Sequence, residues 1–296
     1  MKFLSELSTD SLICSELQVK YYKELLKCSF GDEPNEQIFI DTICEICSKI
    51  TNKEPQYFKQ LNIIDLFCLL LDIRINSQGD VCKVVVTKDE KQMNLELRLD
   101  YIKEELKAIH KLFSNLTIKS NDLEVMFECP SSERLLQKAD EEYFYFIKNI
   151  YSTSSGKHIN INTNNEAKLL CEKLPAKIFL QIMQKFEELV KCITSINFLS
   201  RYGITEQNLI FFPTLSSLIW FVKLIFGESL ETFYDNLFYL SHLGHMSTEY
   251  IESSVVGEYN YFVSCLQRTL AAKNGPQEPT EQFISDEEAG FIDEPA

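Results

Sequence analysis

Residues 61–74, with the sequence LNIIDLFCLLLDIR, constrain the fold of this chain more than any other segment. Only Asn62, Asp65 and Asp72 interrupt the apolar stretch before the arginine at its end. A helix that is apolar around most of its circumference has to be covered on most sides. The sequence therefore predicts a buried helix, which ends at the polar residues 77–79.

The segment after this helix predicts a β-hairpin. Two runs, VCKVVVT and MNLELRL, flank the polar turn KDEKQ. β-Branched residues and alternation of apolar with polar residues are typical of paired strands. We expect Leu95, Leu97 and Leu99 on one face of the second strand.

Three further stretches have apolar residues three or four positions apart, which predicts amphipathic helices. Asp, Asn and Pro stand at their expected starts, where these residues are favoured. The three helices are residues 34–50, capped by Asp32 or Asn35; residues 101–113, capped by Asp100; and residues 175–193, beginning at Pro175.

The remaining segments are assigned from shorter signals of apolar pattern and turn residues. We expect a short strand at 122–130, a helix from Ser131 to Ile150, a turn and strand at 152–162, a pair of strands within 197–213, and only helices from Thr214 to Lys273.

These assignments predict an α+β chain, predominantly α-helical, with a small antiparallel β-hairpin. We expect an N-terminal section at 1–115 that contains the hairpin at 81–99, and a mainly helical second section at 116–273. Residues 274–296 contain seven acidic side chains, three prolines and no Lys or Arg. That composition predicts a disordered acidic tail.

Charge and hydropathy argue against two classes of partner. The chain has 29 basic and 44 acidic residues and a formal charge of −15, whereas binding to nucleic-acid phosphates needs a surplus of Lys and Arg. The N-terminus lacks the apolar core of a signal peptide. The most apolar window, 208–226, contains Pro213 and Lys223 and lacks the run of about 20 apolar residues that spans a bilayer. We expect an intracellular chain that binds no nucleic acid and no membrane.

Ten cysteines are scattered along the chain, and without a secretory signal we expect them to be reduced. The closest pair, Cys44 and Cys47, lies inside a predicted helix and lacks the second pair that a zinc ribbon needs. We interpret both as core residues.

The sequence SSGKH at 154–158 is similar to the end of a phosphate-binding loop. That loop needs Gly where this chain has Tyr151, and Ser or Thr where it has His158, because the backbone has to wrap the phosphate and a hydroxyl has to bind magnesium. We therefore predict an ordinary turn.

His242 and His245, with Glu249 nearby, form the one pair of close imidazoles. Zinc needs three or four ligands, and Gly244 favours a helix end at which a histidine contacts free carbonyl groups. A metal-dependent hydrolase that uses this pair stays an alternative. Two Cys–His combinations, Cys265 with His242 and Cys129 with His110, lack a recognisable context for nucleophilic catalysis. We predict no enzyme, and no catalytic, metal-binding or cofactor-binding residues.

Aromatic and apolar residues are the favoured contact groups, because Tyr, Trp and Phe are enriched in protein interfaces. Apolar pairs also interrupt the acidic tail, as in segments that fold on binding a partner; a tail that only increases solubility fits the composition equally well. The predicted partner-binding residues are Trp220, Phe221, Phe283, Ile284, Phe291 and Ile292.

The apolar helix and the hairpin together resemble the T-even-type bacteriophage family of baseplate hub and hub-assembly proteins. In that family the helix ends in Leu/Ile-Arg-x-x-Ser-x-Gly and leads into a hairpin that closes with an Asp-hydrophobic pair. Residues 21–28 also resemble the start of that family, and residues 214–271 resemble its helical end loosely. The matching positions are Asp65, Arg74, Ser77, Gly79 and Asp100.

The resemblance implies a non-enzymatic phage tail protein that acts in assembly of the baseplate hub, as a subunit or as an assembly chaperone. Its partners would be other hub and tail proteins, and it would work in the bacterial host cytoplasm or in the virion. Some relatives carry cysteine pairs in the hairpin that look able to hold zinc, but this hairpin has only Cys82. An acidic regulatory protein that mimics nucleic acid is the alternative from a different class.

Overall fold

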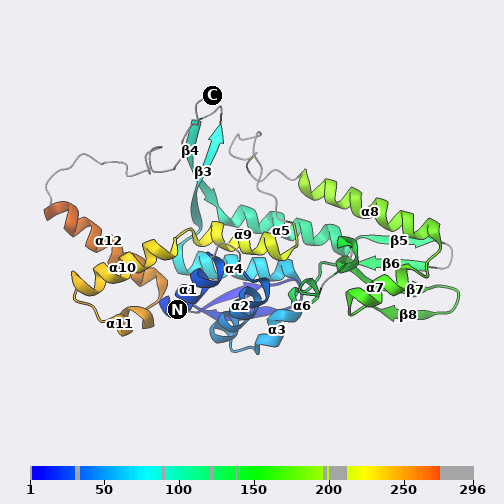
Figure 1. Ribbon diagram of the computed structural model, residues 1–296, viewed down its shortest axis with the longest axis horizontal. Coiled ribbons are helices and arrows are strands. Elements are labelled where there is room, and N and C mark those ends of the chain that lie inside the picture. Colours follow the sequence, from blue (N-terminus) through cyan, green and yellow to red (C-terminus); the bar gives the residue numbers. More distant parts are fainter. Residues whose placement is uncertain are drawn as a thin grey trace, which may run out of the picture.

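The computed structural model is mainly helical and contains three small antiparallel sheets in its described part (Figure 1). It describes residues 2–30, 34–88, 91–120, 123–137, 139, 141–195, 199 and 212–273. The predicted α+β, predominantly helical fold is therefore confirmed. The predicted acidic tail at 274–296 lies outside the described residues.

Helix α4 (Ile63–Gln78) is the central helix, and 13 of its 16 residues are buried. The side-chain oxygen of Asn62 accepts a 2.9 Å hydrogen bond from the Asp65 amide and caps the helix. Strand β1 (Lys2–Glu6) and the helices α5 (Leu99–Ser114), α9 (Leu215–Phe226) and α12 (Val256–Lys273) all contact α4. The predicted buried helix is confirmed, because neighbours from both ends of the chain cover it.

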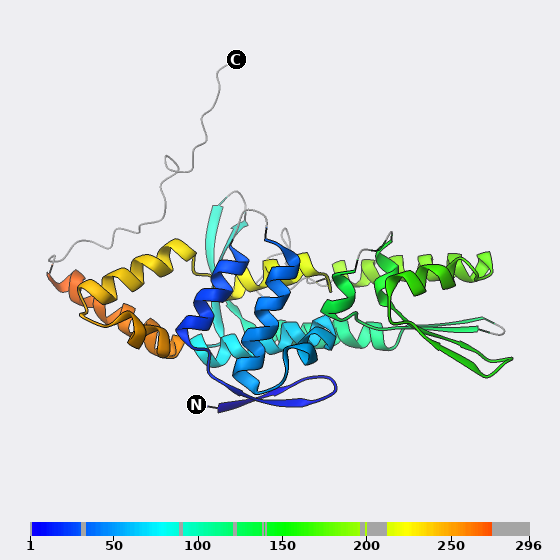
Figure 2. The same ribbon diagram turned by 60° about the horizontal axis from the view of Figure 1, so that its bottom comes forward.

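The N-terminal residues form an antiparallel hairpin of β1 and β2 (Ser11–Ser15) that the sequence analysis did not predict. Figure 2 shows this hairpin beneath the helices α1 (Val19–Ser29) and α2 (Glu36–Thr51). Helix α3 (Pro55–Gln60) follows. Asn35 caps α2 by accepting a bond from the Ile38 amide, as predicted, and its alternative, Asp32, lies outside the described residues.

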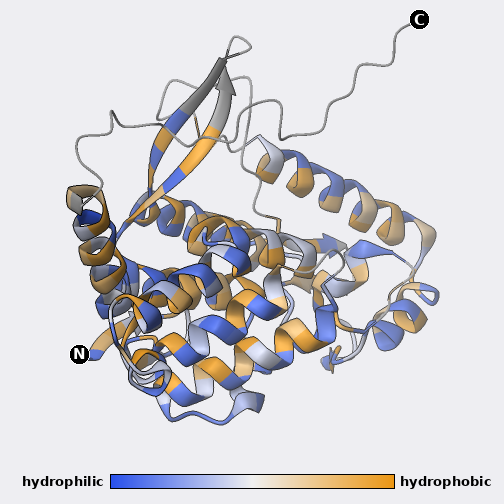
Figure 3. Ribbon diagram, turned by 60° about the vertical axis from the view of Figure 1, so that its left-hand side comes forward, coloured by the Kyte–Doolittle hydropathy of each residue, from blue (hydrophilic) through white to orange (hydrophobic). Residues whose placement is uncertain are grey.

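The second hairpin, β3 (Val81–Lys88) and β4 (Lys91–Arg98), projects from the body (Figure 1). The hairpin carries both hydrophobic and hydrophilic residues (Figure 3). They alternate along the described part of β4, where Leu97 is buried while its neighbours Glu96 and Arg98 are exposed, whereas β3 has adjacent apolar residues such as Val84 and Val85. The predicted hairpin is confirmed except at its end, because Leu99, which we expected on the second strand, is the first residue of α5.

The helix that follows begins two residues earlier than predicted. Helix α5 begins at Leu99, so Asp100 lies in its first turn and Arg98 is the capping residue. The Leu99 amide is bonded to the Asp80 carbonyl, which ends the hairpin ladder at residue 98. The Asp100 carboxylate forms a 3.0 Å ion pair with Arg98.

A four-stranded antiparallel sheet at one end of the molecule has the order β5-β6-β7-β8. The sheet confirms the predicted strands near 122–130 and 152–162, and Gly156 turns between the last two strands with a φ of +64°. Its strands are β5 (Thr117–Ser120), β6 (Leu123–Phe127), β7 (Ile147–Ser152) and β8 (Lys157–Asn160).

The predicted helix from Ser131 to Ile150 is wrong. The chain instead forms a short helix α6 (Ser132–Leu135), a 3₁₀ turn η1 (Glu142–Phe146) and then strand β7. Strand β7 pairs with both β6 and β8. These partners lie elsewhere in the sequence, so the local apolar run at 143–147 could not distinguish strand from helix.

Helices α7 (Asn164–Cys171) and α8 (Ala176–Thr194) accompany this sheet, and α8 contacts both β5 and α5. The predicted α8 is confirmed together with its apolar stripe, because the residues at helical spacing are all buried: Ile178, Ile182, Phe186, Leu189 and Ile193. The Phe146 ring stacks on Phe113 of α5 at 4.9 Å and contacts Phe186 of α8 at 5.3 Å. The strand pair predicted within 197–213 falls almost wholly outside the described residues.

The C-terminal helices return to the start of the chain. Helix α10 (Leu230–His242) follows α9, and α11 (Thr248–Ser253) follows α10, so the prediction of helices alone from Thr214 to Lys273 is confirmed. Between α11 and α12, Ser254 accepts a 2.9 Å bond from the Val19 amide, and the Val256 amide donates a 2.9 Å bond to Leu17. These backbone bonds attach the last helices to the N-terminal section.

Candidate functional site

The two aspartates of α4 attach the N-terminal hairpin to the central helix. Asp65 accepts bonds of 2.9 and 2.5 Å from the amide and hydroxyl of Ser8. Asp72 accepts a 2.7 Å bond from the Ser5 hydroxyl and forms a 2.6 Å ion pair with Lys103 of α5. Residues seven apart lie on the same face of a helix, two turns from each other. Both carboxylates therefore have structural partners.

Arg74 connects three segments through backbone carbonyl groups. It donates bonds of 2.6 Å to Ile225, 2.7 Å to Gly79 and 3.2 Å to Val81. The side chain is 7% exposed, and burial lowers the pKa of its guanidinium. A charged group in such a place is stable only when its donors are satisfied, and three carbonyl groups satisfy them here.

The rest of the motif has an equally structural role. Ser77 accepts a 3.2 Å bond from the Leu17 amide, and Gly79 has a φ of +93°, which glycine adopts without strain. The positions that carry the family resemblance therefore determine how the chain folds around α4.

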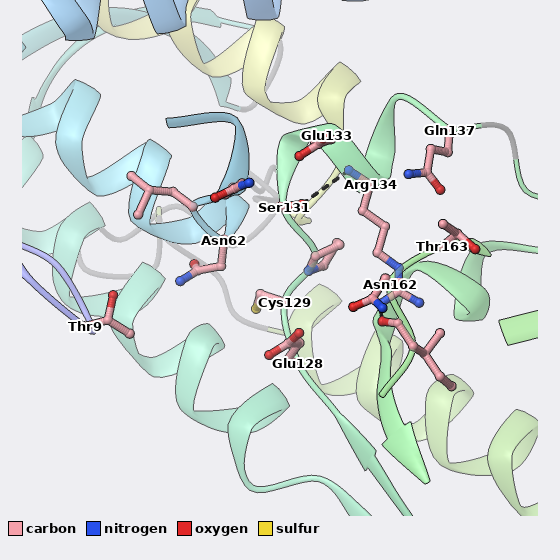
Figure 4. Close-up of a pocket in the computed structure, with 14 residues that line it drawn as sticks. Thr9, Asn62, Glu128, Cys129, Ser131, Glu133, Arg134, Gln137, Asn162 and Thr163 are labelled. Carbon is pink, nitrogen blue, oxygen red and sulfur yellow. Dashed lines mark hydrogen bonds between the residues drawn. The ribbon is translucent and has the colours of Figure 1, made fainter. Parts of the chain in front are cut away.

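A cavity of about 600 Å³ lies between the N-terminal section and the sheet (Figure 4). Its lining is polar, with carboxylates, hydroxyls and amides from loops that come from four parts of the chain. Arg134 is 6% exposed there and donates bonds of 2.7 Å to the Phe144 carbonyl and 3.1 Å to Asn164. The arginine thus joins the sheet loops to each other.

The cavity lacks an activated thiol, since burial raises the pKa of Cys129 well above its ordinary value. Cys129 lines this cavity, whereas His110 lines a second one beside the N-terminal hairpin. The pair considered as a Cys–His combination is therefore not brought together in one cavity.

The other candidate residues for chemistry occupy structural positions. Cys44 and Cys47 are fully buried in α2, as predicted, and burial raises the pKa of the Cys44 thiol to about 12. In SSGKH, residues 154–156 lie in the predicted turn between β7 and β8, and Lys157 and His158 begin β8. In the described part of the chain no group of three or more His, Cys, Asp or Glu residues could hold a metal ion.

The histidine pair lies at the end of α10, which ends at His242 as expected. The His242 ring stacks on Phe238 at 4.1 Å with an interplanar angle of 24°. Gly244 follows, and a Cβ there would lie 2.6 Å from the Leu240 carbonyl oxygen, so the helix end requires glycine.

The structure separates the first two predicted partner-binding residues. Trp220 is 40% exposed, whereas Phe221 is fully buried with its ring 4.9 Å from that of Phe67. Phe221 is therefore a core residue, because adjacent helix positions point about 100° apart. The other four predicted residues lie outside the described part of the chain: Phe283, Ile284, Phe291 and Ile292.

Helix α10 carries an aromatic surface that the sequence analysis did not single out. Its only buried residues are Phe233 and Leu240. Tyr234, Phe238 and Tyr239 are 42%, 54% and 45% exposed. The sequence of α10 did contain a signal for this surface. Its apolar residues stand at neighbouring positions and are too many to lie all on one buried face of a helix. Exposed aromatic side chains on one helix are typical of a protein-binding surface.

No helix of the described residues has the length and apolar character to cross a bilayer. The model of one family, described as T4 bacteriophage base plate protein, matches residues 3–199. That range contains every element from β1 to α8, apart from the first residue of β1, whereas α9 to α12 follow it. No curated protein and no solved structure matches the chain significantly.

Proposed function

The chain belongs to the family of T4 bacteriophage base plate proteins, and we propose that it serves the hub of the baseplate. A member of this family has a structural or assembly role and contacts other baseplate proteins. Within that role, we assign this chain to the building of the hub, as a hub subunit or as an assembly factor.

The family match over residues 3–199 is the observation that carries the proposal. The arrangement of the chain supports it. The polar residues that carry the resemblance to the hub proteins, such as Asp65 and Arg74, bind amide, hydroxyl and carbonyl groups of this chain. An exposed aromatic helix is available for contacts with other chains.

The mechanism we propose is non-covalent and non-enzymatic. Apolar and acidic surfaces hold hub subunits and cover their exposed apolar areas until neighbouring subunits replace them. Burial of apolar surface drives such association, and like charges keep unassembled copies apart. The work takes place in the host cytoplasm during assembly, and a hub subunit would also stay in the virion.

Co-expression of the chain with individual hub and tail proteins tests this function. We expect at least one hub protein to become more soluble and to co-purify with the chain. Binding to none of them, with the chain correctly folded, would contradict the hub assignment.

The protein content of purified virions separates the two forms of the proposal. A hub subunit is present in a fixed ratio to other baseplate proteins. An assembly factor is absent from virions, although baseplates fail to form when its gene is deleted.

A further inference from the structure

The outward side of α10 combines aromatic rings with carboxylates. Glu231, Tyr234, Asp235, Phe238 and Tyr239 are all exposed. Tyr234 and Phe238 are one helical turn apart, as are Glu231 and Asp235, so rings and carboxylates form adjacent rows on the helix. We call these five residues the α10 face. It lies in the helical end of the molecule, beyond residues 3–199 (Figures 1 and 2).

The rings of this face are held in place before any partner arrives. Phe238 stacks on His242 and also contacts Tyr239 edge-on at 5.9 Å. Such contacts restrict ring rotation, which reduces the entropy lost on binding. The buried side of the helix anchors it through Phe233, whose ring lies 5.9 Å from Tyr22 and 5.5 Å from Tyr259.

Among the described residues, the two carboxylates of the face lack an ion-pair partner. In the part of the chain that the structure describes, neither Glu231 nor Asp235 forms an ion pair, whereas Glu252 of α11 is paired with Lys23. Acidic residues outnumber basic ones by 44 to 29 in the chain as a whole. The face therefore offers negative charge beside exposed aromatic area.

We propose that the α10 face binds a basic amphipathic helix of another baseplate protein. The inference rests on the proposed function only in naming a baseplate chain as the source of that helix. Arg or Lys side chains one turn apart on the partner match the spacing of Glu231 and Asp235, and their stems and charged heads fit over the rings of Tyr234 and Phe238. Apolar residues of the partner cover Phe238 and Tyr239.

Charge argues against the other occupants. Nucleic-acid phosphates and anionic lipid headgroups would be repelled by the carboxylates. A second copy of this chain, or its own acidic residues 274–296, would bring more negative charge to the face. The crosslinking experiment described next would detect any of these occupants.

A photo-crosslinking residue identifies the occupant. The full chain carries p-benzoylphenylalanine at one position, Phe238→p-benzoylphenylalanine or Tyr239→p-benzoylphenylalanine, and is produced together with the other baseplate proteins. Leu180 of α8, which is 63% exposed, receives the same replacement as a control. After irradiation the crosslinked peptide is sequenced by mass spectrometry.

We expect both α10 positions, but not position 180, to capture the same Lys- or Arg-rich helical segment of another baseplate chain. An acidic segment, a peptide of this same chain, a nucleotide or a lipid would overturn the proposal. So would the absence of a crosslink at both positions in a complex that has formed.

Binding of a synthetic peptide tests separately whether the α10 face prefers a basic helix. The probe is a helical peptide of Leu, Ala and Arg with the arginines four residues apart, and its twin carries Glu in place of Arg. Aromatic anchors in interfaces contribute about 1.4 kcal/mol or more, so Phe238→Ala should weaken binding of the Arg peptide about tenfold. Glu231→Gln combined with Asp235→Asn should weaken it about fivefold at low salt and less at high salt.

A matched control distinguishes binding at the α10 face from attraction of the peptide to the negative charge of the whole protein. Glu45→Gln removes an exposed carboxylate from α2 and should leave peptide binding unchanged. Equal binding of the Arg and Glu peptides, or an equal effect of Glu45→Gln, would contradict the inference. If the chain bound the Arg peptide but no hub protein, the proposed binding at the α10 face would stand and the hub function would be refuted. If it bound a hub protein but not the Arg peptide, only the proposal for the α10 face would be refuted.

Discussion

Arg74 donates a 2.6 Å hydrogen bond from Nε to the carbonyl oxygen of Ile225, which lies 151 residues further along the chain. The bond connects the central helix, within the family match, to the end of α9, beyond it. The hydroxyl of Tyr22 donates to the next carbonyl, Phe226, at 3.2 Å. The C-terminal end of α9 is thus capped by side chains from two earlier helices, which satisfies carbonyl groups that a helix leaves free.

Arg74→Ala should therefore destabilise the whole protein. The substitution leaves the carbonyl groups of Gly79, Val81 and Ile225 without their donor, and one unsatisfied buried group costs about 1–3 kcal/mol. We expect a loss of about 3 kcal/mol or more in the free energy of unfolding, measured with chemical denaturant. Arg268→Ala on α12, whose guanidinium bonds only within its own helix, is the control; an equal loss there would contradict the assigned role.

Phe221→Ala should destabilise the protein by about 3–5 kcal/mol, the usual cost of deleting a buried phenyl ring. Its neighbour Trp220 is 40% exposed, so Trp220→Ala should cost less. Thermal unfolding of both variants checks the order. If Phe221→Ala kept full stability and lost only partner binding, its assignment to the core would be incorrect.

Glu228 should make stability depend on pH. Burial raises the pKa of its carboxyl above the ordinary 4.5, although Asn236 donates to it at 3.0 Å and Tyr259 at 3.3 Å. Because the folded-state pKa is the higher one, the contribution is fully present below the ordinary pKa and is lost as pH rises through the raised value. Glu228→Gln, which stays uncharged, should therefore be more stable than the parent at pH 7 and lose that advantage near pH 4. Unfolding curves at both pH values measure the difference, and a larger advantage at pH 4 would reverse the assigned sign.

The cysteines should react with thiol reagents in a fixed order. Burial raises the pKa of Cys44 to about 12, so little thiolate forms at pH 8, whereas Cys192 is exposed. Alkylation of the native protein followed by peptide mapping should label Cys192 first and Cys44 only after unfolding. Rapid labelling of Cys44 in the native state would show that the core around α2 is open.

Sequence periodicity correctly predicted those helices and strands whose pattern of apolar and polar residues is visible within the segment itself. Helix α4 is apolar on nearly every side, α8 has a buried stripe at helical spacing, β3 is rich in β-branched residues, and β4 alternates apolar with polar residues. The residues of the family motif were identified from sequence as well. Their roles were not, because Arg74 and Asp65 bind groups that are distant in sequence.

The sequence by itself determined which stretches had to be buried, because apolar periodicity follows from the geometry of one helix or strand. Only the tertiary structure decided which neighbours cover them. Strand β7 became a strand because β6 and β8 pair with it, and Phe221 became a core residue because α4 lies against that side of α9. The rings of α10 are exposed because the described elements cover its other side, and burial is a property of two surfaces that one segment cannot specify.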